Sequence, residues 1–150
     1  MMHYLRREQF LPVTINEAWN FFSSPANLKI ITPPQLDFKT ISDMPDTIYP
    51  GLFIRYRIKP LLNVPMDWVT EITHVNAPHY FVDEQRSGPY SIWHHEHHFK
   101  VAEGGILMTD ILHYDIGKSV FGWVAGRVFV HQKVKAIFDY RELVLKNLFK

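Results

Sequence analysis

The sequence contains no cysteine. Disulfide bonds, thiolate metal sites and a cysteine nucleophile are therefore excluded, and a reducing compartment is favoured. No apolar run approaches the roughly 18 residues that a membrane-spanning helix needs. The amino-terminal segment carries charges where a secretion signal would be apolar, in the stretch MMHYLRREQF. We therefore expect a soluble, cytoplasmic protein with no membrane span.

The sequence also lacks an excess of charge of either sign, because it has 16 basic and 15 acidic residues and a net charge of +1. A protein that binds nucleic acid needs a basic surface to neutralise phosphates, so nucleic acid is not an expected partner. The usual motifs of serine hydrolases, nucleotide-binding loops and zinc proteases are missing too. We predict no cofactor.

Aromatic residues, in contrast, are abundant. The chain has eleven Phe, seven Tyr and four Trp, and apolar residues make up 47% of it. Such side chains build either a core or a ligand pocket. A chain of 150 residues has the usual size of one domain, and no repeat or linker divides it. We expect a single ligand-binding domain over residues 1–150.

The first third of the chain predicts a strand followed by two short helices. Residues His3 to Leu11 alternate loosely and predict a first strand. Thr14 and Glu17 have the spacing of a capping box, which predicts a helix after them. Ser24 can cap a second short helix over Ala26–Ile31.

The middle of the chain shows short apolar runs separated by turn residues, as in an antiparallel sheet. The predicted strands are Leu36–Ile41, Gly51–Pro60, Met66–Val75, His79–Arg86, Tyr90–Glu103 and Ile106–Ile116. From Ser119 to Phe149, apolar residues recur at helical spacing and proline is missing, which predicts a long helix. Gly122 and Gly126 either permit a close approach near its start or loosen its beginning. We expect an α+β fold in which a curved sheet of six to seven strands leaves a hollow around this helix.

Several stretches resemble the helix-grip superfamily called SRPBCC, which includes START domains, the birch-pollen-allergen fold and polyketide cyclases/dehydrases. They are Trp19–Phe22, Pro25–Pro33, Gly51–Tyr56, Gln85–Phe99, Met108–Tyr114 and Ile137–Arg141. The chain looks closest to an uncharacterised bacterial branch. The resemblance implies the helix-grip fold with an internal cavity. Members of the superfamily bind lipids, sterols, polyketides, hormones or quinones, and only some are enzymes, so it does not fix a function.

The run Trp93-His94-His95-Glu96-His97-His98-Phe99 is the most unusual local feature. Alternation along a strand places His95 and His97 on one face, together with Trp93 and Phe99. The aromatic neighbours indicate that this face points inward. The opposite face carries His94, Glu96 and His98 and is expected to face solvent.

Three interpretations of His95 and His97 are open. The pair can supply half of a zinc site, with Asp110 or Asp83 as a third ligand. It can perform acid–base chemistry, with Asp110 setting the tautomer of an imidazole and raising its pKa. The favoured interpretation is that the pair forms hydrogen bonds in a wet cavity or to a ligand, without metal or catalysis.

We therefore predict a non-catalytic protein that binds a small hydrophobic or lipid-like molecule. Alternatives are a cyclase or dehydratase with His95 and Asp110 as its acid–base pair, and a protein-interaction module. Arg55 and Arg57 are expected outside the cavity, because unpaired charges are rarely buried. The predicted ligand-binding residues are Trp19, Phe22, Phe53, Trp68, Gln85, Trp93, His95, His97, Asp110, Val130 and Val134.

Overall fold

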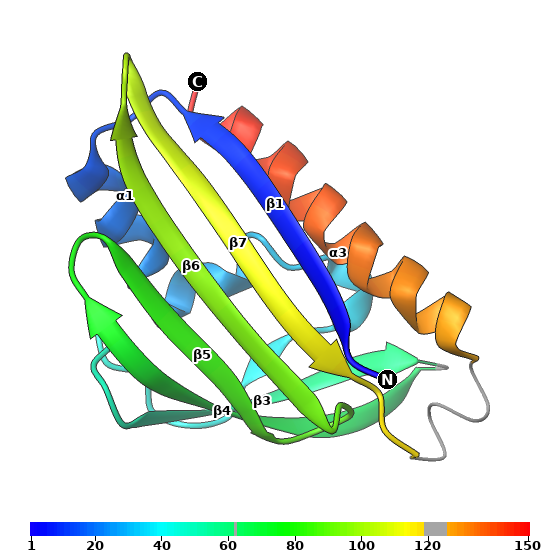
Figure 1. Ribbon diagram of the computed structural model, residues 1–150. Coiled ribbons are helices and arrows are strands. Elements are labelled where there is room, and N and C mark those ends of the chain that lie inside the picture. The colour runs from blue at the N-terminus through cyan, green and yellow to red at the C-terminus, as the bar shows by residue number, and fades with distance from the viewer. Residues whose placement is uncertain (62, 119–125) are drawn as a thin grey trace.

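A computed structural model describes all of the chain except residues 62 and 119–125. Within the described residues, seven strands form one antiparallel sheet in the order β1-β7-β6-β5-β4-β3-β2 (Figure 1). Their bounds are β1 (His3–Leu11), β2 (Lys39–Thr40), β3 (Leu52–Leu61), β4 (Val64–Asn76), β5 (Tyr80–Ser87), β6 (Ile92–Ala102) and β7 (Gly105–Asp115). The curved sheet and the long C-terminal helix confirm the predicted α+β architecture.

The helix α1 (Ile15–Phe22) begins with the predicted capping box. The Thr14 side chain accepts a hydrogen bond from the Glu17 backbone N–H at 3.2 Å, and the Glu17 carboxylate accepts one from the Thr14 backbone at 2.8 Å. These reciprocal bonds satisfy two backbone N–H groups that a helix start leaves without partners. They fix the point at which the chain turns from β1 into α1.

The segment after α1 differs from the prediction. In place of a helix over Ala26–Ile31, the chain forms the 3₁₀ helix η1 (Pro25–Lys29), and the Ser24 side chain makes no capping hydrogen bond. Most of the strand predicted over Leu36–Ile41 is replaced by a second 3₁₀ helix, η2 (Pro34–Leu36), and a loop before the two-residue β2. Pro25 and Pro34 each stand at the start of a 3₁₀ helix, where the fixed φ of proline favours a helical turn and its missing N–H needs no partner.

The last described element is the 22-residue helix α3 (Arg127–Leu148). It packs beside β1, where Arg7 forms ion pairs with Asp139 at 2.6 Å and Glu142 at 3.2 Å (Figure 1). The predicted start of this helix at Ser119 and the predicted role of Gly122 lie outside the described residues. Gly126 precedes the helix with φ of +67°, a conformation that glycine adopts without strain.

Alternation along the strands determines what is buried. In β7, every second side chain from Ile106 to Tyr114 is buried, and the side chains between them are half-buried. The apolar members of this set pack into two clusters, one around α1 and the other against Val130, Val134 and Phe138 of α3. Within the described residues, no helix combines the length and apolar character that crossing a membrane requires.

Candidate functional site

A cavity of about 180 Å³ lies between the inner face of the sheet, the short helices and α3. An apolar cavity of about 150 Å³ is large enough to bind benzene, so this one has room for a molecule of one or two rings. Its wall is mostly aliphatic and aromatic. Prominent members are Phe21, Phe22, Leu28, Phe38, Ile54, Tyr56, Trp68, Ile72, Phe81, Tyr90, Trp93 and Phe138.

Four polar side chains come together on the inner face of the sheet because of the strand register. Asp83 of β5 lies directly opposite His95 of β6, and His97 of β6 lies directly opposite Asp110 of β7. Opposite residues of an antiparallel pair point to the same face. His95 and His97 are two residues apart and share that face as well. The register therefore places both imidazoles between two carboxylates.

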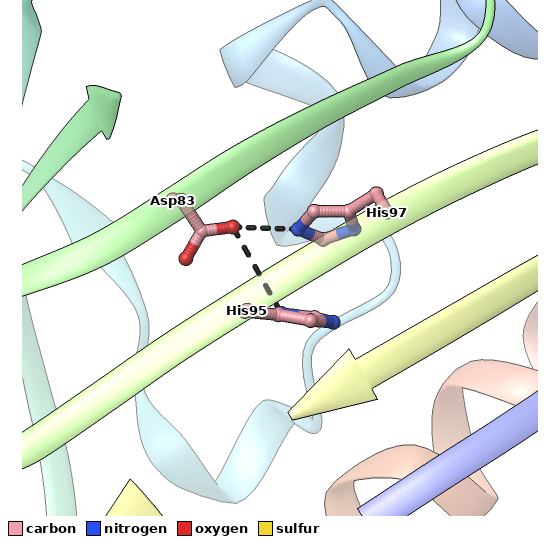
Figure 2. Close-up of side chains that lie close together, drawn as sticks. All are labelled: Asp83, His95 and His97. Carbon is pink, nitrogen blue, oxygen red and sulfur yellow. Dashed lines mark hydrogen bonds and ion pairs between the residues drawn. The ribbon is translucent and has the colours of Figure 1, made fainter. Parts of the chain in front are cut away.

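The distances show that each imidazole contacts both carboxylates. His95 Nε2 donates to Asp110 Oδ1 at 2.8 Å. His97 Nε2 donates to Asp83 Oδ2 at 2.5 Å (Figure 2). The remaining nitrogens point the other way: His95 Nδ1 lies 3.8 Å from Asp83 Oδ2, and His97 Nδ1 lies 3.3 Å from Asp110 Oδ1. The two rings contact each other, with centroids 3.8 Å apart. Among the described residues, no buried polar side-chain atom lacks a hydrogen-bond partner.

A fifth polar group, which the sequence analysis did not identify, comes from α3. The Arg141 guanidinium lies 3.6 Å from Asp110 Oδ1 and 5.7 Å from the centre of the Phe138 ring. Arg141 is 9% exposed. The sequence offered one signal for this residue, because Arg141 stands among the apolar, inward positions of the predicted helix. An arginine buried at such a position requires a carboxylate partner.

The pKa values of the carboxyl groups reflect these contacts. Burial by itself raises the pKa of Asp110, but the Arg141 charge and the hydrogen bonds from His95 and His97 outweigh it and hold that pKa well below its usual range. Burial likewise raises the pKa of Asp83, and the hydrogen bond and charge of His97 reverse that effect and lower it. Both carboxyl groups are therefore ionised at neutral pH.

The two imidazoles shift in opposite directions. Burial and the charge of His97 lower the pKa of His95, although Asp110 opposes them. Asp110 does raise the pKa of His95, as expected, but burial and the charge of His97 outweigh it, so the net shift is downward. For His97, burial lowers the pKa, but the hydrogen bonds to Asp110 and Asp83 outweigh it and raise the value. The pKa of His97 therefore lies above that of His95, and at a pH between the two values His97 is protonated while His95 is neutral.

Five of the predicted ligand-binding residues line the cavity, namely Phe22, Trp68, Trp93, His95 and His97. Asp110 lies behind the two imidazoles, fully buried, and is not part of the cavity wall. The predicted residue Gln85 instead bonds to the backbone of Tyr90, through Nε2 to the carbonyl at 2.5 Å and through Oε1 to the N–H at 3.1 Å. It holds the turn that positions Tyr90.

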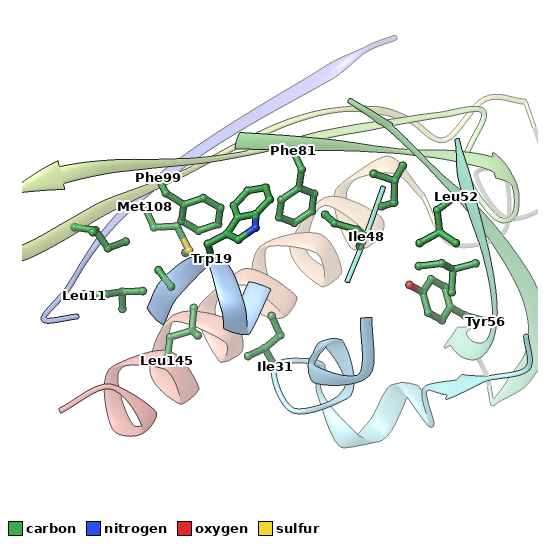
Figure 3. Close-up of a cluster of buried hydrophobic side chains, with 14 of the residues drawn as sticks. Leu11, Trp19, Ile31, Ile48, Leu52, Tyr56, Phe81, Phe99, Met108 and Leu145 are labelled. Atoms are coloured by element: carbon green, nitrogen blue, oxygen red, sulfur yellow. The ribbon is translucent and has the colours of Figure 1, made fainter. Parts of the chain in front are cut away.

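The remaining predicted wall residues lie elsewhere. Trp19 packs edge-on against Phe81 and Phe99 in the core between the sheet and the helices, beside the cavity (Figure 3). Val130 and Val134 belong to the other core cluster, against β7. Their helical positions were read correctly as buried, but burial in a core and exposure to a cavity give the same sequence pattern.

Phe53 is a correction. Its side chain is 54% exposed on the outer face of β3, whereas its neighbour Ile54 is 1% exposed and lines the cavity. The alternation of the strand places Phe53 on the face that carries Arg55 and Arg57, both exposed as expected. The aromatic character of Phe53 suggested a position in the cavity wall, whereas the alternation along the strand predicts the outer face, where the side chain lies.

Comparison with known proteins supports the fold. No protein-family model matches the sequence, and no curated protein matches it. Solved structures do match. Protein Ms6760 from Mycobacterium smegmatis has a TM-score of 0.65 at 16% identity, covering 97% of this chain and 92% of that one. A protein from Arthrobacter aurescens has a TM-score of 0.69 at 11% identity, covering 96% and 86%.

The structure of Ara h 8.0201 has a TM-score of 0.65 at 12% identity and covers 98% of this chain and 99% of its own. Identities this low are informative about architecture only. All of these matches extend over nearly the whole chain, so they include the sheet, the short helices and the long C-terminal helix. The chain therefore has the helix-grip fold of the birch-pollen-allergen type, as the resemblance to the SRPBCC superfamily implied.

Proposed function

We propose that the protein binds a small, mostly apolar molecule in the cavity and orients it through a polar group that faces Asp83, His95 and His97. The observation that carries this proposal is a cavity wall that is mostly aliphatic and aromatic and holds Asp83, His95 and His97 together at one place. Ligand sites typically combine a large apolar surface for affinity with a few polar groups for orientation.

The size of the cavity narrows the ligand class. A volume of about 180 Å³ suits one or two rings rather than a sterol or a two-chain lipid. The aromatic side chains Trp68, Tyr90 and Trp93 pack on one another, with ring centroids 4.8 to 5.5 Å apart. Flat ring faces of this kind favour a flat ligand. An aromatic molecule of one or two rings with one hydrogen-bonding group is the best match.

Indole is a suitable first probe, because it is a flat two-ring compound with a single N–H donor. Binding to the native state alone raises the free energy of unfolding, by about 2.7 kcal/mol at a ligand concentration 100 times Kd. We expect the melting temperature of the protein to rise with indole concentration. The variant Ile72→Trp, which fills the cavity, should lose this rise.

Ile41→Trp is the matched control, because Ile41 is exposed and does not line the cavity. It should keep the indole-dependent rise. The rise is compared within each variant, so a lower starting stability of Ile72→Trp does not affect the result. Equal stabilisation of both variants would place the binding outside the cavity. No stabilisation of wild type by indole, phenol or naphthalene would contradict the proposal.

A second candidate function, acid–base catalysis, is favoured by one specific contact. The buried Asp110 carboxylate accepts a hydrogen bond from the Nε2–H of His95, which leaves His95 Nδ1 on the side of Asp83 and the cavity. A carboxylate that fixes the tautomer of an imidazole is typical of a general base. A cyclase or dehydratase would use this base to remove a proton from an acidic carbon. Solvent deuterium should then enter 2-tetralone, a ketone probe, with wild type and not with His95→Gln.

A further inference from the structure

We propose that Asp83, His95 and His97 bind one divalent transition-metal ion, best matched by zinc, at the cavity wall. This goes beyond the proposed binding of an organic molecule and does not depend on it. Among the described residues, these three form the one group of three or more acidic or histidine side chains whose ligand atoms all lie within 4.8 Å of one another. The site joins neighbouring strands β5 and β6 (Figure 2).

The interatomic distances suit a small ion. The ligand atoms are Asp83 Oδ2, His97 Nε2 at 2.5 Å from it, and His95 Nδ1 at 3.8 Å from it. Around a tetrahedral zinc ion with bonds of about 2.0–2.1 Å, ligand atoms lie about 3.3 Å apart. The two observed distances lie on either side of that value. Side-chain movements of less than about 1 Å, with no change of the strands, would therefore complete the coordination.

Asp110 supplies what a histidine metal site needs behind its ligands. Metal-binding histidines almost always donate their second ring N–H to a carboxylate or carbonyl, which fixes the tautomer. Here the second nitrogens of both rings converge on Asp110 Oδ1, His95 Nε2 at 2.8 Å and His97 Nδ1 at 3.3 Å. One buried carboxylate thus orients both imidazoles toward Asp83.

Arg141 separates the roles of the two carboxylates. Its guanidinium lies 3.6 Å from Asp110 Oδ1, so a second cation bound directly to Asp110 would be repelled. No ion pair of Arg141 with Asp83 lies within 4.0 Å among the described contacts. Asp83 is therefore the metal ligand, and Asp110 is a positioning residue held by Arg141.

Charge and burial favour a doubly charged ion. Metal-coordinating imidazoles are neutral, so in the metal-bound cluster Asp83 and Asp110 face one guanidinium and leave one negative charge for the ion to compensate. His95 and His97 are 5% and 4% exposed, so water screens this charge poorly. Two nitrogen ligands and one oxygen ligand suit zinc better than calcium or magnesium, which prefer oxygen. Three protein ligands leave a fourth position for water or for a ligand in the cavity.

The first experiment is a zinc titration of chelator-treated, full-length protein in the presence of a competing chromophoric chelator. We expect one zinc ion per chain. Asp83→Asn and His97→Ala should each weaken zinc binding more than 100-fold, because each removes a ligand. Asp110→Asn should weaken it by about 10–100-fold, the range typical of residues that orient metal ligands.

The outer face of β6 provides the matched control. The double variant His94→Ala/His98→Ala removes two histidines from the same strand and should leave the zinc affinity unchanged. A wild-type protein that takes no zinc from the chelator would overturn the proposal. So would zinc binding that survives both Asp83→Asn and His97→Ala, or binding that is lost only in the outer-face variant.

A second measurement needs no variant and so cannot be confused by misfolding. Nitrogen-15 NMR of zinc-loaded wild type should show coordination through Nδ1 of His95 and Nε2 of His97, with protons on the opposite nitrogens. Coordination through the same type of nitrogen in both rings would contradict the geometry. Failure of this site leaves the organic-ligand proposal intact, because the indole test is performed on zinc-free protein.

Discussion

Strand β6 carries four histidines, two on each face, and the two pairs are held in different ways. On the inner face, His95 and His97 are almost fully buried and bond to carboxylates of the neighbouring strands, Asp83 and Asp110. Their partners are separated from them by 12 to 15 positions in the sequence and are brought into place only by the strand register.

On the outer face, His94 and His98 both contact Glu96 of their own strand, at 3.3 and 2.8 Å. His94 also contacts Glu84 of β5 at 2.5 Å. These side chains are partly exposed, so water and salt screen their charges. Identical residue types on one strand thus form a tightly held buried cluster on one side and a loosely coupled surface cluster on the other.

The difference shows which physical quantity turns a histidine–carboxylate cluster into a candidate site. Hydrogen-bond lengths are similar on the two faces, from 2.5 to 3.3 Å. Burial is not. A buried ionised group that loses its partner retains its full desolvation cost, whereas an exposed one regains water. The inner cluster must therefore be complete to be stable, and an incoming ligand or ion meets groups that are already oriented.

The strongest test of this comparison removes one carboxylate from each face. Asp110→Ala should lower the free energy of unfolding by about 3–5 kcal/mol, because it leaves Arg141 and two imidazoles buried without their shared partner. Glu96→Ala on the outer face should change it by less than about 1 kcal/mol. Urea unfolding of the two variants beside wild type measures both values. Similar losses for the two variants would remove the distinction between the faces.

A second test extends the comparison to the apolar residues of β3. Ile54→Ala should lower the free energy of unfolding by about 2–3 kcal/mol, near the lower end for such changes because the side chain already borders a cavity. Phe53→Ala should alter it by about 0.5 kcal/mol, despite the larger side chain, because Phe53 is exposed. The same unfolding experiment decides between them. A greater loss from Phe53→Ala would mean that the outer face of β3 is covered by something.

Strand alternation was sufficient to predict which histidines point inward, because the period of two is a local property of the chain. It placed His95 and His97 on the inner face and His94 and His98 on the outer face, as the structure has them. The capping box at Thr14 was equally local and was also found. The same rule, applied consistently, would have excluded Phe53 from the cavity.

The partners of the inner histidines could not be chosen from the sequence. Asp83 and Asp110 were both possible third members. The registers of β5 and β7 against β6 place one on each side of the histidines, and only the packed fold shows that Asp83 lines the cavity and Asp110 does not. Arg141 depends on how α3 packs on the sheet, which is a long-range property of the whole fold. Core and cavity positions such as Val134 and Trp68 also share one pattern, since both are apolar and inward.

The smallest expected effect is a difference in pKa between two adjacent histidines, His94 and His95. Burial lowers the pKa of His94, but hydrogen bonds to Glu84 and Glu96 outweigh it and raise the value above 6.5. His95, one position on, has its pKa lowered below 6.5 by burial and by the charge of His97. An NMR titration of the histidine ring protons in zinc-free protein should therefore show His94 losing its proton at a higher pH than His95.

The stability that His94 contributes follows from the sign of its shift. A pKa raised in the folded state favours folding at pH values below 6.5, and this contribution is lost as the pH rises through the folded-state pKa. His94→Gln should therefore destabilise the protein more at about pH 6 than at about pH 9, by less than about 1 kcal/mol because the site is partly exposed. Urea unfolding at the two pH values measures this difference. A destabilisation that is larger at the higher pH would mean that burial, and not the two glutamates, controls His94, and the outer face would then resemble the inner one.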